Sequence, residues 1–105
     1  MGTANPFVAL VIYPTAAAAQ LREADIFMSV SAESLRACPG FLRGRVFVSE
    51  DGASVVTLTE WRDRESFAQF RQTDAGRASV VLVADLHPHP YWLRQHAEIE
   101  AAPRA

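Results

Sequence analysis

Two histidines and a tyrosine near the end of the sequence have a spacing that could support acid-base chemistry. His87, His89 and Tyr91 occupy alternate positions, so on an extended strand they would project from one face, with Pro88, Pro90 and Trp92 on the other. Because histidine titrates near neutral pH, either His87 or His89 could act as a general base. The segment therefore predicts a proton-accepting site.

Two other interpretations of this segment stay open. A His-Pro-His-Pro sequence is typical of an exposed turn that enters an edge strand. The His-x-His spacing also suits a metal, but a third ligand would have to come from His96, Asp85 or a distant carboxylate. We predict no metal.

A second candidate site lies where an aromatic side chain follows a hairpin. Trp61 ends an apolar strand just before a helix that starts at Arg64, so it could form one wall of a small-molecule pocket or pack against the helices. Arg43 and Arg45, on the preceding strand, could hold an anionic oxygen of a ligand, pair with acids across a dimer, or belong to a solvated strand face.

The elements that would position these residues can be predicted from periodicity. The unbroken apolar run Phe7 to Tyr13 predicts a central strand, which Pro14 ends. Thr15 is a candidate cap for a following helix, with Gln20 on its wet side. The apolar stripe of that helix contains Leu21, Ala24, Met28, Ser31 and Leu35, with Phe27 and Val30 beside it.

The second half of the chain predicts a hairpin followed by helices. Pro39-Gly40 stops the first helix, and Asp51-Gly52 turns the chain between two strands. Asp63 is a candidate N-cap for a helix that carries Phe67 and Phe70. The expected ranges are strands at 41–49 and 54–61, a short helix or turn at about 75–84, and a last extended segment at 87–96.

Composition limits the classes of function. The 105 residues predict one domain, with a core at about 7–96, and half of them are apolar, which favours a second subunit or an enclosed pocket. The ten basic residues are all arginine and scattered, and the net charge is −2, so we expect neither a nucleic-acid partner nor a membrane partner. The single cysteine, Cys38, and the absence of a signal peptide or membrane span favour a cytoplasmic location.

The predicted order of strand, helix, hairpin, helix and strand is an α+β layout, with helices gathered on one side of an antiparallel sheet. At this level the chain resembles the antibiotic biosynthesis monooxygenases. The resemblance spans roughly residues 7–96. It depends on the first strand ending in Tyr-Pro, on Pro39-Gly40-Phe41-Leu42, on the Asp51-Gly52 turn, and on Val55-Val56-Thr57-Leu58-Thr59-Glu60-Trp61. It implies a ferredoxin-like domain that forms a homodimeric α+β barrel.

The resemblance also implies a reaction and a set of site residues. Similar proteins oxidise anthrones or hydroquinones in aromatic polyketide pathways with molecular oxygen, without a metal or bound prosthetic group, and some relatives use reduced flavin. Trp61 stands where the family has its active-site tryptophan. The family's asparagine four residues earlier is Thr57 here, its tyrosine six residues later is Phe67, and its arginine on the next helix falls near Val81. The match therefore implies the fold and the pocket more firmly than the mechanism.

The leading hypothesis is therefore an oxygenase for an aromatic polyketide. Without a metal, oxygen reacts with a phenolic substrate only after the substrate has lost a proton, either to a base or through its own acidity. We expect Trp61, His89 and His87 to be catalytic, and the substrate to contact Thr57, Thr59, Tyr91, Phe27, Met28, Phe67, Phe70, Arg43 and Arg45.

Two alternative functions stay open. A binding or cyclase module would shape a polyketide without oxygen chemistry. Haem degradation, known in relatives, needs an axial histidine, and none occurs between Trp61 and His87.

Overall fold

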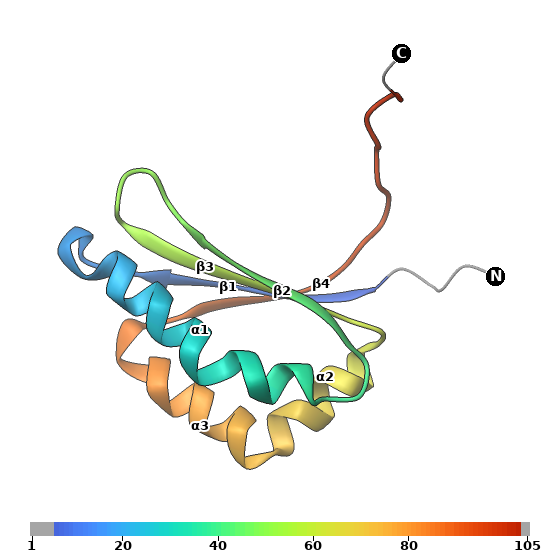
Figure 1. Cartoon of the computed structure of the whole chain (residues 1–105), viewed down its shortest axis with the longest axis horizontal. Helices are drawn as coiled ribbons and strands as arrows, with labels where there is room; N and C mark the ends of the chain where they lie inside the picture. The colour runs from blue at the N-terminus through green and yellow to red at the C-terminus, as the bar shows by residue number, and fades with distance from the viewer. Residues whose placement is uncertain (1–5, 104–105) are drawn as a thin grey trace.

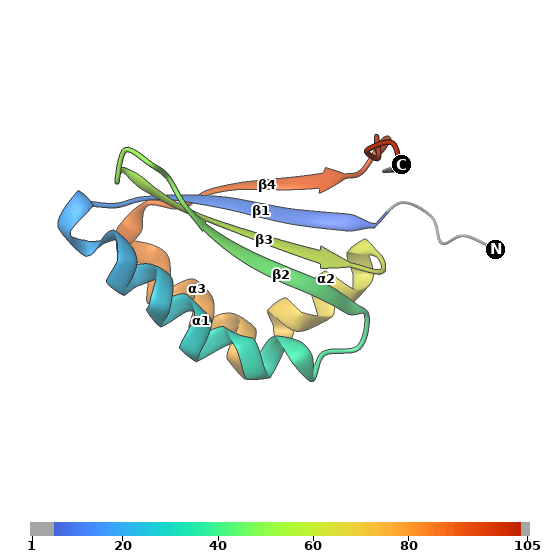
Figure 2. The same ribbon diagram turned by 45° about the horizontal axis from the view of Figure 1, so that its top comes forward.

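The chain folds as one antiparallel sheet with its helices on one side (Figures 1 and 2). This computed structural model describes residues 6–103, apart from the side chains of residues 30–31 and 82–83. The four strands are β1 (Phe7–Pro14), β2 (Phe41–Val48), β3 (Ser54–Trp61) and β4 (His89–Arg94), in the order β2-β3-β1-β4. The helices are α1 (Gln20–Arg36), α2 (Arg64–Gln72) and α3 (Asp74–Val83).

The predicted α+β fold with a central first strand is confirmed. Strand β1 pairs with β3 on one side and β4 on the other, so its backbone is hydrogen-bonded along both edges. The sheet remains open in the single chain, because β2 and β4 are both edge strands. This strand order is the ferredoxin-like arrangement.

The period of two along each strand gives the sheet two different faces. On the helix-facing side of β1 and β3, the side chains of Phe7, Ala9, Tyr13, Val55 and Trp61 are buried. The opposite side, here called the open face, has no helix over it in the described chain (Figure 2). Register places the following residues on the open face: Val8, Leu10, Ile12, Arg43, Arg45, Phe47, Val56, Leu58, Glu60, His89, Tyr91 and Leu93.

The start of the first helix differs from the prediction. Thr15 does not cap α1, because a short 3-10 turn (Ala17–Ala19) comes first and Thr15 Oγ1 instead donates to the carbonyl of Gly52. Gln20, predicted on the wet side, is buried. Its Nε2 donates to the carbonyls of Ser49 (2.9 Å) and Ser54 (2.8 Å), so this side chain ties α1 to the end of the hairpin.

The buried side of α1 is also rotated from the predicted stripe. Ala24 and Phe27 are buried, as a helix packed on the sheet requires, whereas Leu21 is 66% exposed and Met28 is 50% exposed. The side chains of Val30 and Ser31 lie outside the described part. The spacing of apolar residues in the sequence correctly predicted an apolar helix. It did not predict which residues of that helix contact the sheet.

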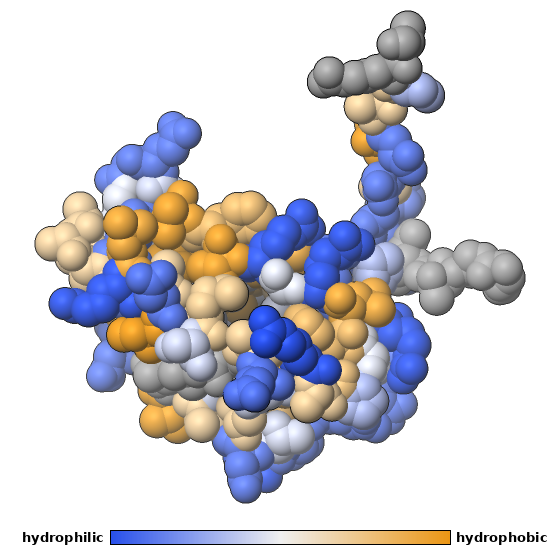
Figure 3. All heavy atoms as spheres, in the orientation of Figure 1, coloured by the Kyte–Doolittle hydropathy of each residue, from blue (hydrophilic) through white to orange (hydrophobic). Residues whose placement is uncertain are grey.

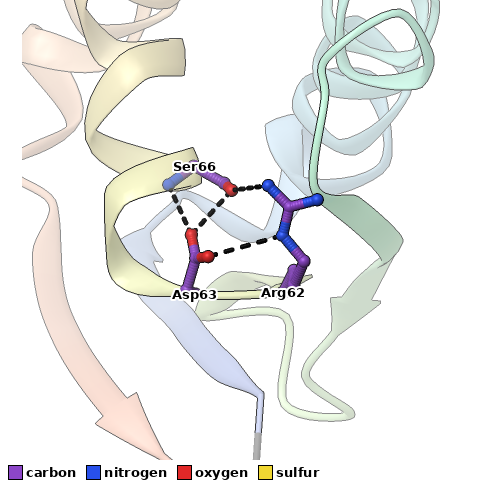
Figure 4. A network of polar contacts seen from close by, with 3 residues as sticks. All are labelled: Arg62, Asp63 and Ser66. Carbon is purple, nitrogen blue, oxygen red and sulfur yellow. Dashed lines mark hydrogen bonds and ion pairs between the residues drawn. The ribbon is translucent and has the colours of Figure 1, made fainter. Parts of the chain in front are cut away.

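A polar network fixes the junction between β3 and α2, as Figure 4 shows. The Asp63 carboxylate accepts from the backbone N–H of Ser66 (2.8 Å) and from its hydroxyl (2.7 Å), so the predicted N-cap is confirmed. Arg62 lies beside both, with Nε 3.4 Å from Asp63 Oδ2 and Nη2 3.4 Å from Ser66 Oγ. These contacts set the direction in which α2 leaves Trp61.

Gly40 holds the other end of this junction. Its φ is +82°, and a Cβ built there would overlap Ser66 Oγ, so the position requires glycine. The Gly40 carbonyl accepts from the backbone N–H of Arg62 at 2.7 Å, which ties the start of β2 to the end of β3.

The last segment is shorter than predicted. Strand β4 begins at His89, and His87 precedes it with φ +53°. The alternation of His89 with Tyr91 therefore holds, but His87 stands outside the strand.

Candidate functional site

A cavity of about 370 Å³ lies between the helix-facing side of the sheet and the three helices. Pockets that hold small molecules generally span roughly 300–1,000 Å³. Figure 3, drawn in the orientation of Figure 1, shows a hollow between α1 and the strands, with apolar surface around it and hydrophilic residues at its edge.

All four strands and all three helices contribute to the cavity wall. The strands supply Ala9, Val11, Tyr13, Phe41, Gly44, Arg45, Val46, Thr57, Thr59, Trp61, Pro90 and Trp92, with Pro88 just before β4. The helices supply Phe27, Met28, Ala32, Leu35, Arg36, Phe67, Phe70, Arg71, Gly76, Ser79 and Val80. The wall is therefore mostly aromatic and aliphatic, with a few hydroxyls and three arginines.

Trp61 forms the base of the cavity and is surrounded by aromatic rings. Its ring centroid lies 5.3 Å from that of Phe41, 5.6 Å from that of Phe67 and 5.5 Å from that of Phe70. The side chain has no surface exposed to water. Trp61 is thus a fully buried part of the cavity wall, held in place by these three rings.

The indole N–H of Trp61 is already bonded within its own strand. Nε1 donates to Thr59 Oγ1 at 2.9 Å. Because an indole has one N–H to donate, this bond leaves Trp61 without a free donor. A substrate contact to Trp61 would therefore be made by the ring.

Tyr13 and Thr57 provide a polar pair on the sheet side of the cavity. They are diagonal neighbours on β1 and β3, and their side chains share a hydrogen bond. Burial raises the pKa of Tyr13 above its ordinary value, and the hydrogen bond with Thr57 acts in the opposite direction. The phenol is therefore protonated at neutral pH, so Tyr13 is a donor and not a base.

The structure brings many of the predicted site residues together. Those that line one cavity are Phe27, Met28, Arg45, Thr57, Thr59, Trp61, Phe67 and Phe70. Two aromatic helical residues that could have been plain core, Phe67 and Phe70, are therefore both core and pocket wall. The role of each residue in catalysis remains a prediction.

The predicted bases lie elsewhere. His89 and Tyr91 belong to the open face, because they stand opposite Ile12 and Leu10 of β1, and His87 is exposed before the strand. None of the three lines the cavity. The sheet therefore separates these residues from Trp61 within one chain.

The two predicted anion-binding arginines are engaged by one carboxylate. Glu60 Oε2 lies 3.0 Å from Arg43 Nε and 2.8 Å from Arg45 Nη2, and the Glu60 side chain is buried. Burying a carboxylate is costly unless it is paired, and these contacts supply the pairing. Of the two, only Arg45 also reaches the cavity wall.

Several cavity residues were missed at the sequence level. Pro88, Pro90 and Trp92 were assigned to the strand face away from the histidines, and that face is the one that borders the cavity. The same period of two in β1 could have identified Tyr13, which lies on the side of Ala9 and Val11. No local signal pointed to Arg71, because its position depends on how α2 packs against β4.

Cys38 packs at the edge of the hydrophobic core. It packs against the cluster of Phe7, Ala9 and Trp61, and its Sγ donates to the carbonyl of Ser34 at 3.2 Å. Burial raises the pKa of the thiol above its ordinary value, so it is a poor nucleophile at neutral pH.

Comparison with protein families identifies the scaffold around this cavity. The family model described as antibiotic biosynthesis monooxygenase matches residues 7–81, which is more than half of the chain. This chain belongs to the antibiotic biosynthesis monooxygenase family. The matched residues of the chain run from the start of β1 into α3 and include Trp61. No curated protein is a significant match.

Solved structures agree with this membership at the level of the fold. A monooxygenase from the gene ActVA-Orf6 of Streptomyces coelicolor, in complex with nanaomycin D, superposes with a TM-score of 0.80 at 23% identity. The match covers 93% of the present chain and 94% of the Streptomyces coelicolor chain. A point mutant of SnoaB, a cofactor-independent oxygenase from Streptomyces nogalater, gives a TM-score of 0.77 at 16% identity, covering 93% and 100% of the two chains.

The described residues contain neither a membrane-spanning helix nor a cluster of metal-ligating side chains. None of the helices in that part of the chain is long and apolar enough to cross a membrane. Among the same residues, no group of three or more histidine, cysteine, aspartate or glutamate side chains is arranged to hold a metal ion.

Proposed function

We propose that this chain is an oxygenase that oxidises an anthrone or hydroquinone intermediate of an aromatic polyketide pathway in antibiotic biosynthesis. The observation that carries the proposal is the aromatic cavity of about 370 Å³ above Trp61, in a chain of this family. A flat polycyclic molecule matches such a wall, because aromatic side chains stack on rings and methionine adapts to their edges.

The proposed reaction consumes one molecule of oxygen and needs no reductant. An anthrone loses the proton of its activated CH₂ group, and the resulting anion transfers one electron to oxygen. The substrate radical and superoxide then combine into a hydroperoxide, which eliminates water. One oxygen atom ends in the new quinone carbonyl and the other in water, so a CH₂ group and O₂ become C=O and H₂O.

The chain's own residues would orient the substrate and exclude water. The hydroxyls of Tyr13 and Thr57 are placed to hold a phenolic or carbonyl oxygen at the sheet side of the cavity. Phe27, Phe67 and Phe70 would confine the rings. A dry, apolar site strengthens each polar contact that the substrate makes.

Removal of the first proton is proposed to depend on the acidity of the substrate. No histidine, aspartate or glutamate lines the cavity in the described chain, and Tyr13 is protonated. Molecular oxygen is the only co-reactant in this scheme, and reduced flavin from a partner reductase would be needed only for a ring-opening variant of the chemistry.

We also propose that the protein acts as a homodimer in the cytoplasm. Phe47, Tyr91 and Leu93 on the open face are each more than 40% exposed, beside Leu10 and Leu58. A contiguous apolar surface of this kind generally marks an interface. A second copy packed on this face would bury it and close the two sheets into a barrel.

The experiment that tests the function is aerobic incubation with 1,8-dihydroxyanthrone, with and without a reduced-flavin source. Oxygen uptake and quinone formation should exceed the rate of autoxidation. Ala32→Phe fills the cavity from α1 and should abolish the excess rate, whereas Ala78→Phe, an exposed position on α3 outside the cavity, should not.

The alternative functions predict different results. Binding of the anthrone without oxidation above the autoxidation rate would favour a binding or cyclase module. A sharp, stoichiometric Soret band after haem addition would favour haem degradation.

A further inference from the structure

The cavity wall has an unbalanced charge. The arginines in the wall are Arg36 of α1, Arg45 of β2 and Arg71 of α2, and no acidic residue of the described chain joins them. The other titratable group in the wall is Tyr13 of β1, while β3, α3 and β4 contribute none. A neutral aromatic ligand would not need this arrangement.

One of these three arginines, Arg45, directs its charge to the open face of the sheet, on the side away from the cavity. Arg45 Nη2 lies 2.8 Å from the buried carboxylate of Glu60. Arg36 and Arg71 make no ion pair with a carboxylate of the described residues, whereas Arg43 and Arg62 do. Two cations at the cavity are therefore available to a ligand.

Arg71 is held against the aromatic wall. Its Cζ lies 5.8 Å from the ring centroid of Phe67 and 5.5 Å from that of Trp92, so the guanidinium contacts one ring from a helix and one from a strand. The two rings themselves are 5.1 Å apart. Stacking fixes a guanidinium and leaves its N–H donors directed outward from the ring faces.

The structural alternative is that both arginines simply stabilise helix ends. Each stands in the last turn of its helix, where a cation interacts favourably with the helix dipole. That role would be satisfied in open solvent. It does not account for two arginines on one apolar cavity.

We propose that Arg71, assisted by Arg36, makes the cavity selective for the ionised form of an aromatic ligand. This inference rests on the proposed function and deepens it, because the reactive species of the oxidation is an anion and the cavity wall contains no base. The guanidinium would attract the phenolate or enolate oxygen, and the substrate proton would leave to water.

The proposal is tested without turnover, by anaerobic absorbance titration of 1,8-dihydroxyanthrone with the protein across a range of pH. A cation within a few ångströms shifts the pKa of an acid downward by about 1–3 units. We expect the bound anthrone to ionise at a pH lower than the free anthrone by this amount. Affinity should rise as pH increases through this range.

Variants separate charge from packing. Arg71→Gln should remove most of the downward shift, Arg71→Lys should retain part of it, and Arg36→Gln should have a smaller effect. Arg64→Gln, on the same helix but outside the cavity, is the matched control and should behave as the wild type. The non-ionisable 9-methoxyanthracene should bind wild type and Arg71→Gln within about threefold, since stacking contributes modestly at exposed sites.

The outcomes distinguish this inference from the proposed function. An unshifted or raised anthrone pKa in the wild type, or an equal shift in Arg71→Gln, would overturn the inference even if the protein oxidises anthrones. A lowered anthrone pKa without oxygen uptake would uphold it while the oxygenase proposal fails. Circular dichroism of each variant confirms that it is folded.

Discussion

The indole N–H of Trp61 and the hydroxyl of Thr59 form a 2.9 Å hydrogen bond between two residues on the same face of β3. Trp61 is thus a fully buried ring whose N–H already has an acceptor within its own strand. Its polar atom is committed to the fold, and its aromatic surface supports Phe67 and Phe70. This bond gives a first test of how Trp61 acts.

Thr59→Val removes the acceptor while keeping the shape of the side chain. We expect a loss of about 1–3 kcal/mol in the free energy of unfolding, because a buried N–H is left without a partner. Urea denaturation measures this loss. In the Trp61→Phe background the same substitution should cost much less, and an equal cost in both backgrounds would show that the bond contributes nothing.

Gly40→Ala should destabilise the junction of β2 with α2. The positive φ and the overlap of an added Cβ with Ser66 Oγ both oppose the substitution, and backbone strain of this kind costs about 1–3 kcal/mol. Gly52→Ala is the matched control: its φ is +78°, but the nearest contact of its Cβ would be 3.0 Å. Equal losses of melting temperature for the two variants would contradict this account.

Asp63 should give the protein an acid-dependent component of stability. The Ser66 hydroxyl and then the Ser66 backbone N–H hold the pKa of Asp63 below its usual value. A lowered folded-state pKa stabilises the fold above the unfolded-state value, and the contribution disappears as pH falls through the lowered value. Wild type should therefore lose its advantage over Asp63→Asn when denaturation is measured in increasingly acidic buffer.

Ser66→Ala provides the control for that titration. Without the hydroxyl, the main cause of the lowered Asp63 pKa is gone, so the difference between Asp and Asn at position 63 should shrink at neutral pH. A difference that is independent of pH in both backgrounds would mean that the charge of Asp63 does not stabilise the cap.

The open face should control the oligomeric state. Phe47→Glu puts a charge on an apolar, 45% exposed position of this face, so we expect a dimer to dissociate because a buried charge is costly without a partner. Light scattering after size-exclusion chromatography measures the mass. Leu21→Glu, an exposed position on α1, should leave the mass unchanged, and a monomeric wild type would refute the dimer.

His89→Ala should leave anthrone oxidation within about twofold of the wild-type rate, since removal of a true general base costs about 10²–10⁴-fold. The reason is geometric: His89 lies on the open face and the cavity on the other side of the sheet. A large loss of rate in a variant that keeps its oligomeric state would show that His89 takes part in catalysis.

The sequence predicted the strands and the cap at Asp63 well, because alternation and short-range capping depend on neighbouring residues. It misplaced Gln20, whose burial depends on two carbonyls of the hairpin that lie about thirty residues away. Arg71 was missed for the same reason, since its contacts come from Phe67 and Trp92 on separate elements. The histidines suggested a base by residue type, but strand register directs His89 away from the cavity.

The two tryptophans differ in their surroundings in a way that is useful for spectroscopy. Trp61 is sealed from solvent among phenylalanines, whereas Trp92 is 42% exposed and lies at the cavity wall beside Arg71. The emission of Trp61 therefore reports on the integrity of the interior, and that of Trp92 on occupancy of the cavity. The protein carries its own fluorescent reporter pair, and a Trp92→Phe variant would separate the two signals without an added label.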